Sequence, residues 1–412
     1  MKDLKYVLLV VLFGFAATQV SGLEVEIDSP ELHFNQSILD VSPVLEQALL
    51  ELQETLNDGL QLEADGFATE LEGQDLGQFS SQPKLVQGFA NAGSTAAHLG
   101  TQRSFSDYRI FAVTVGTGLA ASAPGLNEAA IGDAVGDIET EGDLYVGAAV
   151  QPITASLGVN TGRWLPGTRM DVKVGYADIP AGLIADEVSF NAVSFGLGVS
   201  YQLVPTYNFP IGFLRWRGVT ASSGLIVQRN TTNIEIDVGG EEGFNSESVT
   251  FGDLGVSDED LRDIPGNQTN QIAGAETEVG YLNVKPVLHA GIDSRTFSIP
   301  LEVSTGVRVL WLFELNAGAG VDMVFGSSQV SVGSSAEVDF VETQVAESLL
   351  SVSRGTASVT AGTTNGPQFL RPRLTAGLGL NLGPLKLDVP LMLYFDSEGN
   401  SVMAGVNLGV VW

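Results

Sequence analysis

The chain has 412 residues, enough for one large domain or two ordinary ones. Its 49 acidic residues outnumber 19 basic ones, and the formal net charge of −30 makes a nucleic-acid-binding surface unexpected, because phosphate binding requires Lys and Arg. The absence of cysteine excludes a disulfide framework and thiol chemistry.

Residues 1–22 have the features of a secretory signal peptide. Lys2 and Lys5 precede an apolar stretch, and small residues follow it, so cleavage is predicted after Gly22. The apolar stretch is short for a transmembrane helix, and the rest of the sequence has no run of 18 or more apolar residues. The sequence therefore predicts an exported protein without a helical membrane span.

An amphipathic helix is predicted over residues 42–64. Leucines recur there at steps of three and four residues, and Ser42 and Pro43 provide the N-cap and the first helical position. Residues 65–106 are rich in Gly, Ala, Ser and Gln, and we expect them to lack regular structure.

From Tyr108 to the end of the chain, the hydrophobic pattern has a period of two residues. In residues 301–313, for example, one face is almost entirely apolar, while the other carries Glu, Ser, Gly and Arg. Many positions on the polar face are glycine, which weakens a strand exposed to water but suits the curved inner wall of a barrel. The predicted strands also have about 10–16 residues, long enough to cross a bilayer. We therefore predict an all-β protein, a transmembrane antiparallel β-barrel of about 12–14 strands over residues 107–412.

The strand directions follow if the C-terminus lies on the periplasmic side. This assignment requires one long strand over residues 211–236 and an additional strand near residues 328–342. Long outer loops are then expected at residues 120–143, 237–275 and 343–367.

The last strand resembles the C-terminal signature of bacterial outer-membrane β-barrels. The positions that match this signature are Val406, Leu408, Val410 and the terminal Trp412. The resemblance implies that the barrel assembly machinery recognises this strand. It also implies a location in the outer membrane of a diderm bacterium, in contact with outer-membrane lipid.

Catalytic, metal and cofactor sites are not indicated by the sequence. His33, His98 and His289 are far apart and form no ligand motif, and there is no Gly-x-Ser-x-Gly sequence. We therefore expect neither an enzyme nor a bound cofactor.

Charged residues of both signs fall on the predicted inner faces of the strands. Such residues can select solutes, or they can form ladders that hold the barrel closed. The candidate lumen-lining residues are Lys173, Arg215, Arg217, Glu302, Arg308, Arg373, Lys386 and Asp388.

The overall plan resembles the long-chain fatty-acid transporter (FadL-like) family. The similarity lies in a barrel of 12–14 strands preceded by residues 23–106, a segment with helical character that can plug the barrel or lie in the periplasm. Pro152 and Pro286 interrupt predicted strands and are candidate kinks, because each lacks a backbone donor. The Asn-Pro-Ala tripeptide of that family is absent from the N-terminal region.

The resemblance implies a channel or transporter for small hydrophobic molecules such as fatty acids. A second hypothesis is a structural or adhesion protein of the cell surface that meets its partners through acidic outer loops. A secreted β-sandwich is a third, which membrane fractionation would separate from the first two.

Overall fold

The structure is a computed structural model. It describes residues 24–28, 32–34, 83–98, 108–123, 145–182, 187–210, 212–237, 244–245, 248–250, 276–343 and 350–412, together with Leu50, Glu54, Gly252, Asp258 and Gly274. The predicted signal peptide and, apart from Leu50 and Glu54, the predicted helix over residues 42–64 lie outside these residues. None of the helices described is both long enough and apolar enough to cross a membrane.

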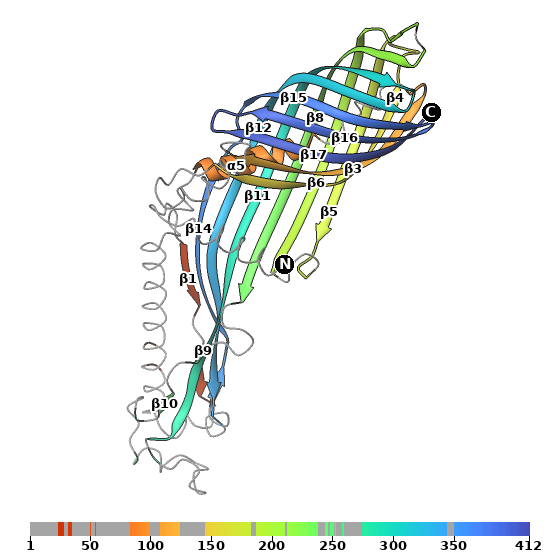
Figure 1. The fold of residues 1–412 in the computed structure, drawn as a ribbon. Helices are drawn as coiled ribbons and strands as arrows, with labels where there is room; N and C mark the ends of the chain where they lie inside the picture. Colours follow the sequence, from red (N-terminus) through yellow and green to blue (C-terminus); the bar gives the residue numbers. More distant parts are fainter. Residues whose placement is uncertain are drawn as a thin grey trace.

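Within the described residues, ten antiparallel strands pair in a closed ring (Figure 1). In ring order, they are β3 (Phe111–Ala123), β4 (Gly147–Asn160), β5 (Thr168–Ile179), β6 (Val188–Val204), β8 (Leu214–Asp237), β11 (Glu278–Val309), β12 (Phe313–Glu342), β15 (Leu370–Leu382), β16 (Leu385–Phe395) and β17 (Asn400–Val411). The last strand, β17, pairs with the first, β3, from Asn400↔Ala123 to Val411↔Ala112. Because this pairing closes the ring, the barrel wall has no free edge there.

Burial alternates along the strands of the ring. In β17, for example, Met403 and Asn407 are buried, whereas Val406 and Leu408 are exposed. The exposed positions around the ring are largely Val, Leu, Ile, Phe and Tyr, and the inward positions are largely Gly, Ser, Thr, Asn and charged residues. This is the arrangement of a transmembrane barrel, with apolar side chains facing lipid and polar side chains facing the lumen.

All four tryptophans lie at the end of the barrel where the chain terminates, which we call the C-terminal end. Trp164 and Trp311 are in the turns after β4 and β11, Trp216 is near the start of β8, and Trp412 follows β17. Trp164 and Trp311 are 80% and 74% exposed. Amphipathic aromatic rings are stable at a membrane–water interface, so this end marks one such interface.

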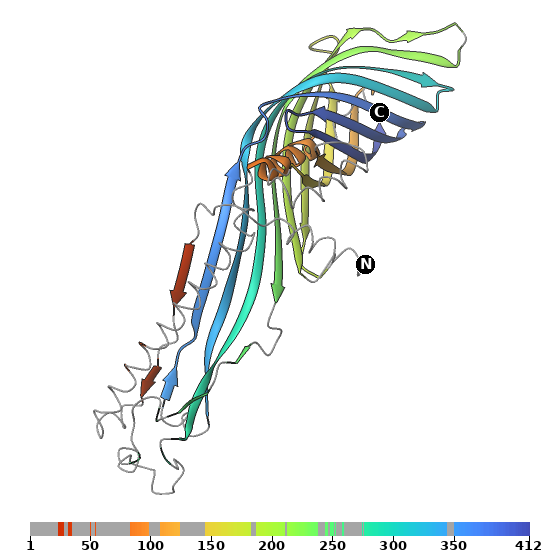
Figure 2. The same ribbon diagram turned by 60° about the vertical axis from the view of Figure 1, so that its left-hand side comes forward.

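Three strands of the ring continue well beyond the other end of the barrel. β8, β11 and β12 have 24, 32 and 30 residues, and their extensions form a long projecting sheet that we call the arm (Figure 2). Beside the arm, β12 changes partner from β15 to β14 (Gly355–Asn365). Gly326 stands at this change with a φ of 139°, and an added Cβ would lie 2.0 Å from the carbonyl oxygen of Arg295.

Short strands complete the sheet. β1 (Glu24–Asp28) pairs with β14; β9 (Phe244–Asn245) and β10 (Val249–Thr250) pair with β11; β7 (Tyr207–Asn208) pairs with β8; and β2 (Leu32–Phe34) pairs with β13 (Leu350–Val352). The main path from β1 to β10 contains thirteen strands, of which ten form the ring.

The structure corrects two expectations about this region. Residues 328–342 continue β12 and are not an additional strand, and residues 355–365 form β14 within the segment expected to be an outer loop. The prediction of one long strand over residues 211–236 is confirmed by β8.

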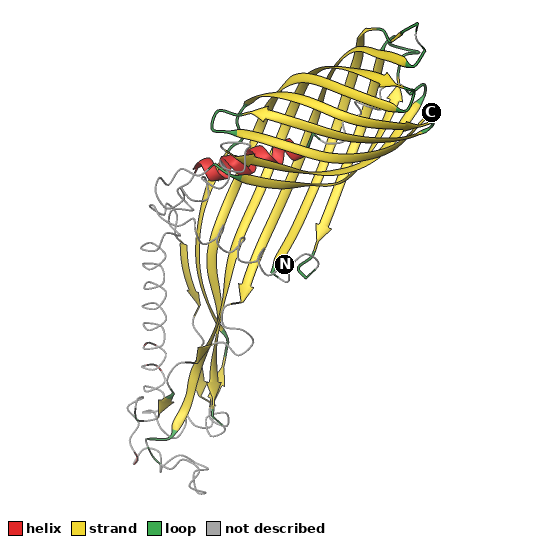
Figure 3. Ribbon diagram, in the orientation of Figure 1, coloured by secondary structure: helices red, strands yellow, loops and turns green. Residues whose placement is uncertain are grey.

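A helix, α5 (Pro83–Ala96), lies inside the ring (Figure 3). The expectation that residues 65–106 lack regular structure is therefore wrong for these residues. Proline is favourable at its first position, but its glycines and serine are poor helix formers. The lumen buries ten of its fourteen residues, and this tertiary environment outweighs the weak intrinsic propensity.

Candidate functional site

The candidate site is the barrel lumen around α5. The helix contacts strands from around the ring and the adjoining arm, namely β3, β4, β8, β11, β12, β14 and β17. Its closest approach to the wall is at Gly88, where an added Cβ would lie 2.4 Å from the carbonyl oxygen of Val146. A Cβ added to the facing Gly147 would lie 2.2 Å from the backbone of Gly88. Glycine on both sides therefore allows the two backbones to touch.

Apolar contacts hold each end of α5. Near its first turn, Leu85 and Val86 pack with Val330 of the arm. At its last turn, Ala96 packs in a cluster that includes Met392 and Met403 of the wall. Between these ends, Asn91 and Ser94 also make polar contacts with the wall.

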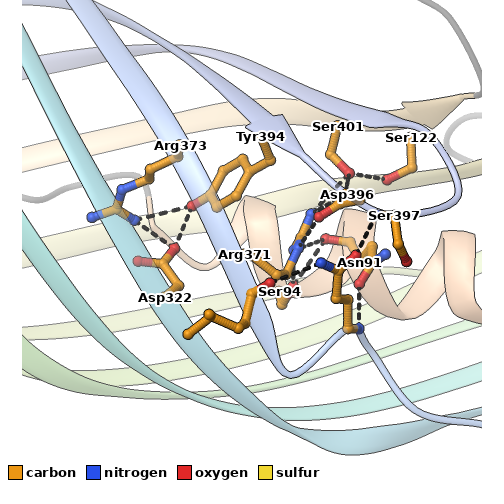
Figure 4. Close-up of polar contacts among 12 residues, drawn as sticks. Asn91, Ser94, Ser122, Asp322, Arg371, Arg373, Tyr394, Asp396, Ser397 and Ser401 are labelled. Atoms are coloured by element: carbon orange, nitrogen blue, oxygen red, sulfur yellow. Dashed lines mark hydrogen bonds and ion pairs between the residues drawn. The ribbon is translucent and has the colours of Figure 1, made fainter.

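Arg371 of β15 joins the helix to the wall (Figure 4). Its guanidinium donates at 2.8 Å to the carbonyl oxygen of Asn91 and also donates to the hydroxyl of Ser94. The other nitrogens donate to both carboxylate oxygens of Asp396 at 2.7 Å, and one of them donates to Ser401 at 2.8 Å. Arg371 and Asp396 have fully buried side chains, so this bidentate pair is shielded from water.

Tyr145, just before β4, extends this network. Its hydroxyl donates to Asp396 at 3.1 Å and accepts from the side-chain amide of Asn91 at 2.7 Å. Burial, followed by the nearby carboxylate of Asp396, raises the pKa of Tyr145 above its ordinary value. The tyrosine therefore stays protonated and can donate.

Arg373 forms a second buried cluster, deeper in the barrel. It donates to Asp322 at 2.6 Å and to Glu302 at 2.9 Å, and the Tyr394 hydroxyl donates to Asp322 at 2.8 Å. Nε2 of His98, just after α5, lies 3.1 Å from the same carboxylate of Asp322. This cluster attaches the C-terminal end of the helix to four strands of the wall, β11, β12, β15 and β16.

Two further groups of charges lie toward the C-terminal end of the barrel. The ammonium of Lys173 donates to the carbonyl oxygen of Ala97, where the negative end of the helix dipole favours a cation. Arg217 and Arg308 both bind Glu314, and the Arg308 contact is 3.0 Å long. Opposite charges on the neighbouring strands β8, β11 and β12 thus pair on the inner wall.

Two cavities continue from α5 to the C-terminal end. The first, of about 80 Å³, has room for several waters and is lined by Arg169, Asp171, Lys173 and by small residues of β6 and β8. The second, of about 290 Å³, lies at the C-terminal end beside Trp311 and Lys386. The lumen thus contains α5 and, toward the C-terminal end, space with charged side chains in its walls.

The structure places the eight candidate lumen-lining residues on the inner side of the wall. Six are buried, and Arg215 and Arg308 are half-buried. Glu302, Arg308, Arg217 and Arg373 form ion pairs.

Sequence reasoning missed the partners of these charges and the residues that hold the helix. The missed residues are Asn91, Ser94, Glu314, Asp322, Arg371, Tyr394 and Asp396. One signal was available, because Arg371 lies two residues before Arg373 and therefore on the same face of its strand.

The two candidate kinks differ. Pro152 lies at a shift in register between β3 and β4, and the hydroxyl of Thr117 donates at 3.0 Å to the carbonyl oxygen of Gln151 beside it. Pro286 lies in the arm opposite Ala336, and the pairing between β11 and β12 continues through it without a shift. Only Pro152 therefore coincides with an irregularity in the barrel wall.

The residues of the C-terminal signature close the ring. Val406 and Leu408 point outward, and the ring of Trp412 stacks on Phe111 at a centroid distance of 4.4 Å. The Trp412 carbonyl accepts from the backbone N–H groups of Arg109 and Ile110 at 2.7 and 2.9 Å. The last residue is therefore fixed to the start of β3.

Within the described residues, no group of three or more His, Asp and Glu side chains could hold a metal ion. No curated relative matches the chain.

Several solved barrel structures are similar to the chain. The translocator domain of the autotransporter NalP from Neisseria meningitidis is 11% identical, with a TM-score of 0.29, over 78% of this chain and 99% of that one. The Escherichia coli outer membrane protease OmpT is 10% identical, with a TM-score of 0.33, over 74% and 98%. The P. putida toluene transporter TodX is 9% identical, with a TM-score of 0.23, over 79% and 99%.

A family model covers most of the sequence. The model described as Lsa36-like matches residues 44–412, which include α5, the whole ring and most of the arm. The chain belongs to the Lsa36-like family.

Proposed function

We propose that this protein is an outer-membrane channel that α5 holds closed and that opens to small molecules when the helix is displaced. The observation that carries the proposal is a helix inside a closed transmembrane ring, with polar cavities between it and the C-terminal end. Between the two apolar ends, Asn91 and Ser94 hold the helix through hydrogen bonds, which can be exchanged for contacts with water when the helix moves.

The outer membrane of a diderm bacterium is the proposed location. Support comes from the outward apolar side chains, the tryptophans at one end and the closing strand that ends at Trp412. In this orientation the C-terminal end faces the periplasm and the arm projects outside the cell. Lipid and the barrel assembly machinery are the corresponding partners.

The passengers are small molecules. Arg169, Asp171 and Lys173 line the first cavity and Arg109, Arg308 and Lys386 the second, so an axial path would suit charged or polar solutes. A hydrophobic passenger, such as a fatty acid in a FadL-like mechanism, would require a path through the wall, and the irregularity at Pro152 is the position we propose for it. The hydrogen bond between Thr117 and Gln151 would have to open for such a passage.

Displacing the helix tests the channel. We expect Gly88→Val to raise the ion conductance of the protein in planar bilayers, because the new side chain collides with the backbone at Val146. Such overpacking costs about 1–3 kcal/mol and raises the population of displaced helices by about 5- to 150-fold. The matched control is Gln87→Val at the neighbouring, half-buried position.

Both variants should keep the heat-modifiable migration of a folded barrel on a gel. An increase in conductance for Gly88→Val alone supports the proposal. The proposal is contradicted if the wild type and both folded variants show the same absence of ion conductance and none of them takes up lipophilic probes into liposomes.

A second candidate, a structural or adhesion role at the cell surface, is favoured by the arm. β12 continues about 17 residues past Phe325, which corresponds to roughly 55 Å of extended strand. Deletion of residues 240–270 should then abolish attachment to surfaces while barrel assembly is retained. Attachment at the wild-type level would contradict this role.

A further inference from the structure

We infer that the chain passes through its own barrel, so that the segment before α5 lies on the arm side of the membrane, opposite the C-terminus. The first evidence is the direction of α5. The side-chain amide of Asn365, at the base of the arm, donates at 2.5 Å to the carbonyl oxygen of Pro83. Leu85 and Val86 pack on Val330, which also lies at the base of the arm. The helix therefore begins on the arm side.

The opposite end of α5 points into the barrel toward the C-terminal end. The carbonyl oxygen of Ala97 accepts from Lys173, which is five residues from Thr168, where β5 begins at the C-terminal end of the barrel. His98 contacts Asp322 in the part of β12 that pairs with β15. The chain is thus inside the barrel lumen at His98.

The next described residue, Tyr108, is at the C-terminal end of the barrel. Its neighbours Arg109 and Ile110 bind the carbonyl of Trp412. The described chain thus enters the barrel on the arm side at Pro83 and is at the opposite end at Tyr108.

The segment before α5 is fixed on the arm. β1 pairs with β14 through five residue pairs, from Glu24↔Thr360 to Asp28↔Thr356. It covers an edge of the projecting sheet that would otherwise expose unpaired backbone groups. Both described ends of residues 28–83 therefore lie on the arm side. The barrel then has a second function beyond the proposed channel. It holds the N-terminal segment on one side of the membrane and the C-terminus on the other.

Because the chain has no cysteine, single cysteines can map the two faces. Glu26→Cys is on β1, Ser397→Cys is in the β16–β17 turn on the arm side, and Arg163→Cys is in the β4–β5 turn at the C-terminal end. All three positions are exposed. Cells that carry each variant would be treated with a bulky maleimide that cannot enter through porins, before and after permeabilisation, and heat-modifiable migration would confirm folding.

We expect Glu26→Cys and Ser397→Cys to react in intact cells and Arg163→Cys only after permeabilisation. The inference would be overturned if Glu26→Cys and Arg163→Cys were labelled under the same condition and Ser397→Cys under the other. The segment before α5 and the C-terminus are inferred to lie on opposite sides of the membrane. Which side faces the outside of the cell rests on the orientation proposed above. If Arg163→Cys alone reacts in intact cells, the passage through the barrel is supported and the proposed orientation fails.

Discussion

Buried charged side chains are the main residue-scale feature of the lumen. Arg371 and Asp396 are completely enclosed, and they connect α5 to two strands. Two buried charges contribute little net stability when they are paired, but removal of one leaves the other unpaired and costs about 3–5 kcal/mol.

We therefore expect Arg371→Met to lower the free energy of unfolding by about 3–5 kcal/mol, because it leaves Asp396 buried without its partner. Urea titration followed by heat-modifiable gel migration measures this change. Arg229→Met is the matched control, since Arg229 is 53% exposed and pairs with Asp293 at the surface. Its cost should be below about 1 kcal/mol. Similar losses for the two variants would contradict a structural role for the buried pair.

The alternation of the sequence predicted which charged residues face the lumen, but not what they bind there. Arg373 was predictable as an inward residue from its strand alone. Its partners Glu302 and Asp322 come from β11 and β12, so their proximity depends on the register between strands distant in sequence. The same pattern could have located Arg371, and it contained no information on the contact with Asn91.

At the scale of elements, Trp412 connects the closing strand to the first strand of the ring. Its ring and its backbone both bind the start of β3. Trp412→Ala should reduce the fraction of heat-modifiable, membrane-inserted barrel several-fold, because the stack and the C-terminal signature are lost together. Trp164→Ala is the control, since that ring is at the same end and 80% exposed. Normal insertion of Trp412→Ala would show that the terminal aromatic ring is dispensable.

The turn between β11 and β12 is the second element with a testable feature. Leu310 and Trp311 both have a φ of 51°, in the left-handed region, and the N–H of Leu312 donates to Val309 at 3.2 Å. Asparagine tolerates this conformation better than leucine. We expect Leu310→Asn to raise the free energy of unfolding by about 1 kcal/mol in the same urea titration. A loss of stability would mean that the exposed leucine contributes more as a membrane contact than it costs as strain.

The sequence predicted the strands far better than α5. A period of two identifies long strands wherever one face is apolar, and β8 was predicted almost residue for residue. The helix has no such pattern, because the lumen surrounds it and favours small residues on all sides. The loop expected at residues 343–367 followed from the assigned strand directions, which did not foresee that β14 pairs with β12 beside the arm.

At the scale of the whole molecule, α5 lies inside a closed barrel. Gly93 and Ser294 of β11 test it directly, because a Cβ added at Gly93 would lie 3.7 Å from the Cβ of Ser294. This separation is close to the average for a disulfide. The variant with both Gly93→Cys and Ser294→Cys can be compared with one that has Gly93→Cys and Val303→Cys, in which the second cysteine faces outward.

The decisive measurement is the disulfide formed by each pair in membrane-inserted protein, detected as a reducible shift on a non-reducing gel. The structure predicts a nearly complete cross-link for Gly93→Cys with Ser294→Cys and none for Gly93→Cys with Val303→Cys. Absence of the first cross-link in a folded, inserted barrel would contradict the placement of the helix in the lumen.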